Sequence, residues 1–150
     1  SNSNYISISN HAKANNFICL KLCGHLEMEI SKIDDKNEKQ EFLEMYNLEE
    51  VGLDTLVSTV YNLLGLITFF TAGPKEIRAW TIRKDSFAPQ AAGVIHTDFE
   101  RGFIKAEIYT IRDLVKHKTE VALKENGLIR LEGKNYIMND GDVVVFKFNV

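Results

Sequence analysis

The chain has 150 residues, of which 45% are hydrophobic and 26% are charged, a composition typical of a soluble globular protein with one or two small domains. Its net charge of −3 excludes a strong overall field that would attract nucleic acid or an anionic membrane. The longest apolar run, GLITFFTAG at 65–73, is too short to span a bilayer, and the N-terminus has no basic-then-apolar signal peptide.

The first predicted element is the run FICLKL at 17–22, whose apolar, β-branched and aromatic residues favour a buried strand. The segment before it, SISNHAKANN at 7–16, is expected to be the frayed end of a larger element. Two cysteines, Cys19 and Cys23, lie on this strand and its exit, too close in sequence for a relaxed disulfide. Because no His or Cys partners stand at metal-binding spacing, we expect reduced, buried thiols in a cytosolic protein.

Two helices are predicted next, over 25–33 and 34–48. In the second of them, Asp35 is placed to cap the N-terminus. Phe42 and Leu43 of the same helix are expected to face inward.

A third helix, GLDTLVSTVYNLLG at 52–65, has the clearest periodicity in the chain. Its apolar residues recur at a period of 3.6 and form one stripe, and Gly65 stands in a good C-cap position. Such a stripe is usually part of a core, and we expect this one to be buried. The stripe consists of Leu53, Leu56, Val57, Val60, Leu63 and Leu64.

One strand and three helices do not make a sheet by themselves. A strand as apolar as 17–22 normally lies inside a parallel sheet that is covered on both faces. We therefore expect residues 1–65 to belong to a domain whose other strands lie outside this chain. Without that sheet, residues 1–35 should be exposed and sensitive to proteolysis, or should pair with a second copy through Phe17–Leu22.

From residue 66 the hydrophobic pattern alternates, which predicts a hairpin of two strands, 66–72 and 76–83, around the turn GPKE. A hairpin, a helix across it and later strands that join the same sheet describe an α+β domain of the β-grasp, or ubiquitin-like, type. The remaining predicted elements are a helix over 88–95 with Pro89 in its first turn, a strand over 103–110, helical turns over 110–117 and 120–126, and three short strands over 128–150 with turns at EGKN and NDGD.

Two stretches of the second half closely resemble the C-terminal end of the YchF/Obg-like ATPase family: GLITFFTAGPKEIRAWTIRKDSFAPQAAGVIHTDFERGFIKAEI and LEGKNYIMNDGDVVVFKFNV. In that family a P-loop nucleotide-binding domain with a helical insertion precedes a TGS domain, which is a β-grasp module. The resemblance implies that residues 1–65 are the incomplete C-terminal end of the P-loop α/β nucleotide-binding domain and that 66–150 are a TGS domain. It also implies a parent nucleoside triphosphatase that uses ATP (or GTP) with Mg.

The phosphate-binding signature of such enzymes is absent from this chain, which contains no GxxxxGK[ST] motif. The nearest match, EGKN at 132–135, lacks the Ser or Thr that would hold Mg²⁺. Without backbone N–H groups that cradle the phosphates, we expect the chain alone to bind nucleotide weakly or not at all and to be inactive. No catalytic residue, metal ligand or cofactor is therefore assigned within this chain.

One possible nucleotide contact follows from the resemblance. Cys23 and Gly24 stand where related P-loop GTPases place a backbone N–H near the base, which implies a partial base contact. His25 and Leu26 depart from the Lys-Ile pair of the family at this place. The alternative interpretation is a purely structural turn from strand to helix.

The stretch APQAAGVIHTDFERGF places His96, Asp98 and Glu100 at alternate positions. A metal site would need further ligands, and acid–base catalysis by His96 would need a nucleophile, so neither function is favoured. Two interpretations remain, a stabilising role in the fold and a contact surface for a partner. In the first, Asp98 caps a turn, and Phe99 or Phe103 fills the space between helix and sheet.

Positive charge is concentrated after residue 65, since residues 66–150 carry 13 Lys and Arg against 11 Asp and Glu, whereas 1–65 carry 5 against 10. A basic sheet surface there would contact RNA phosphates, and the alternative is a set of merely solvated charges. Trp80, which shares a strand face with Arg78 and Ile82, is expected in the core rather than as a base-stacking platform. The residues assigned to this candidate partner or RNA surface are Arg78, Arg83, Lys84, His96 and Arg101.

The resemblance further implies that residues 66–150 are a binding or regulatory module for the ribosome, RNA or a protein, attached to an upstream nucleotide-binding domain in a cytoplasmic protein. The alternative is an independent β-grasp RNA-binding module without a nucleoside triphosphatase parent. That alternative predicts appreciable, salt-sensitive affinity for RNA.

Overall fold

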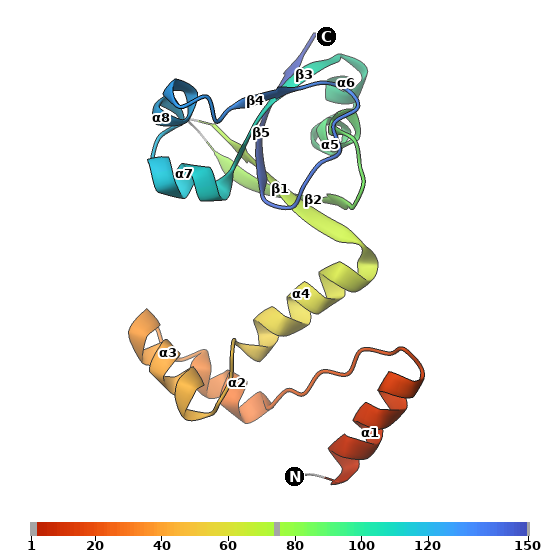
Figure 1. Ribbon diagram of the computed structural model, residues 1–150, viewed down its shortest axis with the longest axis vertical. Helices are drawn as coiled ribbons and strands as arrows, with labels where there is room; N and C mark the ends of the chain where they lie inside the picture. Colours follow the sequence, from red (N-terminus) through yellow and green to blue (C-terminus); the bar gives the residue numbers. More distant parts are fainter. Residues whose placement is uncertain (1–2, 74–75, 150) are drawn as a thin grey trace. The chain divides into compact units, whose positions relative to one another are not determined.

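The computed structural model describes residues 3–73 and 76–149 and divides into two compact units, Ser1–Val60 and Tyr61–Val150. We refer to them as the N-terminal unit and the C-terminal unit. The first is built from helices, and the second contains a five-stranded sheet (Figure 1). The chain is therefore a mixed α+β protein.

The helices of the first part of the chain are α1 (Ser3–Ala14), α2 (Gly24–Ile30), α3 (Lys36–Met45) and α4 (Gly52–Leu64). The three helices predicted from periodicity are confirmed as α2, α3 and α4. Helix α1 replaces the frayed segment that we expected. Its Ser and Asn residues compete for backbone hydrogen bonds and lower helix propensity, so the pattern there is weak.

The start of α3 is capped as predicted. The Asp35 carboxylate accepts hydrogen bonds from the backbone N–H groups of Asn37, at 2.8 Å, and Glu38, at 3.0 Å. Leu43 on the inner face is buried, and Phe42 is half-buried with its ring centroid 4.8 Å from that of Tyr46.

The predicted strand over 17–22 is wrong, because this segment is extended but lies in no strand of the structure. The Phe17 side chain is 66% exposed. A strand requires a neighbour to pair its backbone groups, and an apolar run by itself does not provide one. The expectation of two buried thiols is also wrong, since Cys19 is half-buried and Cys23 is exposed.

The apolar stripe of α4 is exposed, contrary to our expectation of a core. None of the described residues of α4 is buried, and the Leu63 side chain is 70% exposed. Helical periodicity determines which side chains share a face, but it does not say whether another element covers that face.

The sheet of the C-terminal unit has the order β2-β1-β5-β3-β4. The predicted hairpin is confirmed by antiparallel pairing of β1 with β2, in which Phe69 lies opposite Trp80. Pro74 and Lys75 of its predicted turn lie outside the described residues. Strand β5 runs parallel to β1 and antiparallel to β3. The strands are β1 (Leu66–Ala72), β2 (Ile77–Arg83), β3 (Phe103–Thr110), β4 (Arg130–Glu132) and β5 (Asp142–Phe148).

Four helices flank this sheet, with α5 and α6 on one side and α7 and α8 on the other (Figure 1). Their bounds are α5 (Ala88–Ile95), α6 (Thr97–Arg101), α7 (Ile111–His117) and α8 (Glu120–Glu125). The predicted turn after Ile95 is therefore a short helix, α6. Of the three strands predicted over 128–150, two form, and the third is reduced to an isolated bridge between Ile137 and Phe87.

The core has one cluster on each face of the sheet. On the α5 side, Phe69, Ala91 and Ile108 belong to the larger cluster. On the α7–α8 side, Tyr109 and Leu123 are fully covered. The Tyr109 hydroxyl donates a hydrogen bond of 2.5 Å to Oε1 of Glu120. Burial, together with this bond, raises the pKa of Tyr109 above its ordinary value.

The NDGD turn connects β5 to the rest of the sheet. Oδ1 of Asp140 accepts a hydrogen bond of 2.8 Å from the backbone N–H of Thr68, and Gly141 adopts a positive φ of 82°. The buried Asp142 carboxylate accepts from the Tyr136 hydroxyl and from the backbone N–H of Asn139, both at 2.9 Å. This polar network explains why acidic residues flank a glycine at this point.

Candidate functional site

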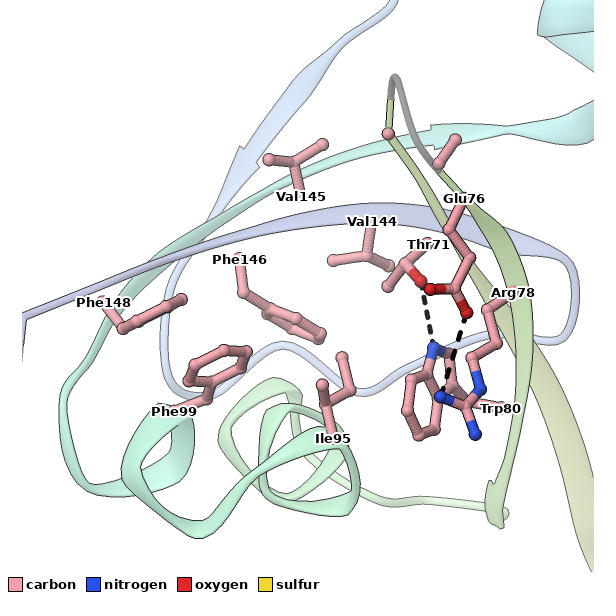
Figure 2. Close-up of a pocket in the computed structure, with 12 residues that line it drawn as sticks. Thr71, Glu76, Arg78, Trp80, Ile95, Phe99, Val144, Val145, Phe146 and Phe148 are labelled. Atoms are coloured by element: carbon pink, nitrogen blue, oxygen red, sulfur yellow. Dashed lines mark hydrogen bonds and ion pairs between the residues drawn. The ribbon is translucent and has the colours of Figure 1, made fainter.

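The C-terminal unit contains an open groove of about 450 Å³ on the side of the sheet that α5 covers (Figure 2). It forms because an eight-residue helix is only about 12 Å long, whereas a seven-residue strand is about 23 Å long. The strand ends beyond the helix therefore remain uncovered. The lining residues are Thr71, Ala72, Gly73, Glu76, Arg78, Trp80, Ile95, Phe99, Val144, Val145, Phe146 and Phe148.

Aromatic side chains form one side of this groove. The rings of Phe99, from α6, and Phe148, from β5, are stacked with their centroids 3.8 Å apart. Phe146 lies next to them in the groove and makes edge-to-face contacts with Phe69 and Phe103 below. These contacts hold the aromatic side of the groove against the core. We expected Phe99 or Phe103 to fill the space between helix and sheet, and Phe103 does so, since it is buried in one cluster with Ala91 of α5.

The opposite side is polar and comes from the hairpin. The Trp80 Nε1–H donates a hydrogen bond of 3.0 Å to Thr71 Oγ1. The Arg78 guanidinium lies 4.3 Å from the Trp80 ring centroid, in a cation–π contact. Glu76 stands 3.9 Å from the same guanidinium (Figure 2). Trp80 and Ile82 therefore face inward, which the alternation along the strand alone left open, and Trp80 packs against the larger core cluster.

The structure separates the basic residues that we had grouped together. Arg78 lines the groove, whereas Arg83 and Lys84 lie at the other end of β2, where the backbone N–H of Lys84 bonds to Gly65. Arg78 and Arg83 are five positions apart along a strand, so they are about 17 Å apart and face opposite sides of the sheet. Arg101 is exposed at the end of α6.

His96 lies beside the groove and caps α6. Its Nδ1 accepts a hydrogen bond of 3.2 Å from the backbone N–H of Asp98, and its ring centroid is 5.8 Å from that of Phe99. The expectation that Asp98 caps this turn is therefore wrong, because the imidazole takes that place. Among the described residues, no three His, Cys, Asp or Glu side chains are grouped so that they would hold a metal ion.

Cys23 and Gly24 lie in the N-terminal unit, at the start of α2. Cys23 is the N-cap residue with extended backbone angles and makes no capping bond through its side chain. Sequence reasoning missed a polar contact made from the same helix, by the carboxylate of Glu27. Glu27 accepts hydrogen bonds from the backbone N–H groups of Gly52, at 3.1 Å, and Leu53, at 3.2 Å, and so caps α4 across 25 residues of sequence.

The groove itself was not predicted as a site. A signal for it exists in the alternation of Val144, Phe146 and Phe148 along the last strand, which places three apolar side chains on one face. We had interpreted that alternation only as a strand.

No helix in the part of the chain that the structure describes is long and apolar enough to cross a membrane.

Comparison with known proteins identifies relatives for the whole described region. The family model YchF-GTPase_C, described as "Protein of unknown function (DUF933)", matches residues 66–149. A protein of Bacillus subtilis (strain 168) named "Ribosome-binding ATPase YchF" is 47% identical over 149 residues, which are 99% of this chain and 40% of that protein. A protein of the same name from Pasteurella multocida is 50% identical over 133 residues, which are 89% of this chain and 36% of that protein.

Solved structures agree with these matches. The YchF GTPase of Schizosaccharomyces pombe superposes with a TM-score of 0.66 at 42% identity and covers 79% of this chain and 31% of that chain. A GTP binding protein from Pyrococcus horikoshii OT3 gives a TM-score of 0.67 over 99% of this chain and 42% of that chain. Its identity of 16% supports the fold alone. This chain spans about two fifths of the length of the two curated relatives.

Proposed function

The chain belongs to the YchF-GTPase_C family, and from this membership we propose that it is the C-terminal portion of a YchF-type nucleoside triphosphatase that acts at the ribosome. The observation that carries the proposal is an identity of 47–50% to proteins named "Ribosome-binding ATPase YchF" over at least 89% of the chain. Ribosome binding would place the protein in the cytoplasm.

Within that protein, residues 66–150 serve as a TGS module of the β-grasp type. Three features support this assignment: the strand order β2-β1-β5-β3-β4, the parallel pairing of β1 with β5 in the middle of the sheet, and α5 across one face. The module contributes binding or regulation, with the ribosome, RNA or a protein as its partner. Its candidate contact residues remain Arg78, Arg83, Lys84, His96 and Arg101.

Residues 1–65 are the C-terminal end of the nucleotide-binding domain. The exposed stripe of α4 and the exposed side chains of Phe17, Ile18 and Leu22 are surfaces that the upstream part of that domain would cover. Where that part is absent, the segment Phe17–Leu22 is available for pairing with a second copy of the chain. In the longer protein, Cys23 and Gly24 would contribute a partial contact to the nucleotide base.

The residues present here do not fit a nucleoside triphosphate with Mg. The sequence has no GxxxxGK[ST] motif, and no three carboxylate, imidazole or thiol groups converge in residues 3–73 and 76–149. A phosphate cradle and a metal ligand set are both required for phosphoryl transfer. Nucleotide and metal are therefore held by the longer protein, and no hydrolytic step is assigned to this chain.

Two measurements test the proposal. The purified chain should co-sediment with ribosomes, and it should show no ATP or GTP turnover above that of a mock purification. Absence of ribosome binding by both the chain and the longer protein would refute the ribosomal part. Turnover by the chain alone would refute the assignment of the chemistry to the missing region. Tight, salt-sensitive binding of free RNA without ribosome binding would instead favour an independent RNA-binding module.

A further inference from the structure

The groove lies where β5 continues past the end of β1. Strands β1 and β5 are parallel, and among the described residues Phe70 and Val143 are the one pair of these strands in register. Beyond that pair β1 continues to Ala72 and β5 to Phe148, and both strands border the groove. In this register Ala72, the last residue of β1, lies opposite Val145, so Phe146–Phe148 of β5 extend past the end of β1 and border an opening.

The backbone of β5 faces this opening. In its antiparallel pairing with β3, alternate residues of β5 direct their N–H and C=O groups away from β3, toward the side of the sheet on which β1 lies. Val145 borders the groove, yet Figure 2 shows its side chain pointing away from Phe146 and Phe99. The main chain of β5 over Phe146–Phe148 has no β1 residue opposite it, and an open strand edge of this kind is the feature that accepts an added strand.

Apolar side chains lie on the floor below this edge. Ile95, Phe99 and Phe146 are partly buried and pack on the core cluster, and Phe148 is 36% exposed at the rim. A volume of about 450 Å³ lies within the range of sites that take a small ligand or a few side chains. The opening therefore combines main-chain pairing groups with a shallow apolar surface.

Charge decides which class of ligand this surface suits. The described lining contains one anion, Glu76, and one cation, Arg78, and the two are 3.9 Å apart. The guanidinium already lies over the Trp80 ring. A nucleic acid strand carries a phosphate on every nucleotide and needs a basic track along its path. A polypeptide main chain is uncharged and makes its contacts through hydrogen bonds, so it matches this nearly neutral groove.

We infer that the groove binds an extended polypeptide segment of a partner protein. The main chain of that segment pairs with the edge of β5 at Phe146–Phe148, and its alternate aromatic or aliphatic side chains lie against Phe99, Phe146 and Phe148. The inference rests on the proposed function, in which the C-terminal unit is a binding module, and it names the class of partner that this module takes.

Trp80 makes the inference directly measurable, because it is the single tryptophan of the chain and lines the groove. The probe is a panel of capped heptapeptides in which Phe, Leu, Ile or Tyr alternates with Ser, Thr or Lys. Each peptide is titrated into the complete 150-residue chain while Trp80 fluorescence and the ¹H–¹⁵N spectrum are recorded. We expect saturable changes in fluorescence and shifts of the amide signals of Val145–Phe148. Ten-nucleotide single-stranded RNAs are titrated in parallel.

Two variants distinguish peptide binding at the groove from nonspecific binding to exposed apolar side chains. Phe148→Ser removes an aromatic ring from the rim and should weaken peptide binding about tenfold. Ile104→Ser removes an apolar side chain that is 56% exposed on β3 outside the groove, and it should change the affinity less than about twofold. The amide shifts of the unmodified chain test the location independently of how well either variant folds.

Three results would overturn the inference: no peptide of the panel binds up to millimolar concentration, the shifted amides lie away from β5, or Ile104→Ser weakens binding as much as Phe148→Ser. Saturable, salt-sensitive RNA binding at the groove in place of peptide binding would also overturn it. Ribosome co-sedimentation separates this inference from the proposed function. Loss of the peptide site with retained ribosome binding refutes only the groove assignment.

Discussion

The two units differ in how they use their apolar residues. In the N-terminal unit the buried hydrophobic side chains, among the described residues, are Ala12, Ile30 and Leu43. The C-terminal unit buries a continuous cluster around Phe69 on one face of its sheet and a second cluster around Tyr109 on the other. A sheet covered by helices on both faces therefore supplies the core of this chain, and helices with an apolar stripe do not supply one by themselves.

This difference shows that a regular hydrophobic period within one helix does not guarantee that the helix has a buried apolar face. The α4 stripe is the most regular pattern in the sequence, yet its residues are exposed. The C-terminal unit has less regular sequence patterns and short helices, yet its apolar side chains form a buried core. Most of the stability of a helix comes from the surface against which its apolar face packs.

The largest expected contrast between the units is in hydrogen exchange. Residues 17–22 lie in no strand, whereas β3 is paired with β5 along most of its length and with β4 over Ala106–Ile108. We expect protection of β3 amides to exceed that of the 17–22 amides by about a thousandfold or more. Mass spectrometry or NMR measures this ratio. Strong protection of 17–22 in a monodisperse monomer would contradict the comparison, and protection that disappears on dilution would indicate pairing between copies.

Next in size is the effect of removing a core ring. Phe69 is fully buried, so Phe69→Ala should lower the free energy of unfolding of the C-terminal unit by about 3–5 kcal/mol. Trp80 fluorescence during urea denaturation reports this unit alone. The matched variant Leu43→Ala, in the N-terminal unit, should leave the Trp80 transition unchanged. An equal shift of that transition by both variants would show that the two units unfold together.

A smaller effect is expected at Gly102, where the chain enters β3. A Cβ atom there would overlap the backbone carbonyl of Asn149, whose N–H bonds to the Gly102 carbonyl at 2.9 Å. Gly102→Ala should cost about 1–3 kcal/mol of stability through this overpacking. Gly133→Ala is the control, because nothing lies within 4 Å of a Cβ at that position. Its effect should stay within about 0.5 kcal/mol, and equal costs for both variants would contradict the steric argument.

The smallest effect tests the N-terminal unit. Asp35→Ala removes the cap of α3 and should destabilise that helix by about 1 kcal/mol, seen as a loss of helical circular dichroism. The Trp80 transition should not move. Asp34→Ala, one position outside the cap, is the control and should change neither signal. If Asp35→Ala also lowered the midpoint of the Trp80 transition, the cap of α3 would contribute to the stability of the C-terminal unit as well.

Much of the C-terminal unit was predictable because its signals are local. The alternation in 66–72 and 77–83 specified the hairpin, and Pro89 marked the first turn of α5. The third strand of the last segment was not predictable as a bridge, since its pairing depends on where Phe87 lies. The cap of α6 by His96 was missed because an imidazole is an unusual capping group.

The candidate site was predictable only in part. Arg78 was selected from its charge and does line the groove, but its cation–π contact with Trp80 depends on which face of β2 turns inward. The stacked pair of Phe99 and Phe148 joins residues 49 positions apart, and no spacing rule relates them. Grouping Arg78 with Arg83 ignored the length of the strand between them.

Local sequence patterns were enough to predict the α+β class, most of the elements and the cap of α3, because each follows from side-chain period or hydrogen bonding within a few residues. It also carried the motifs that relate this chain to its family. The three-dimensional packing was needed to show that the α4 stripe and the side chains of Phe17, Ile18 and Leu22 are exposed, that Trp80 faces inward, and that β5 extends past the end of β1 beside a groove. The physical reason is that burial and strand pairing depend on contacts between residues far apart in sequence, which no local pattern contains.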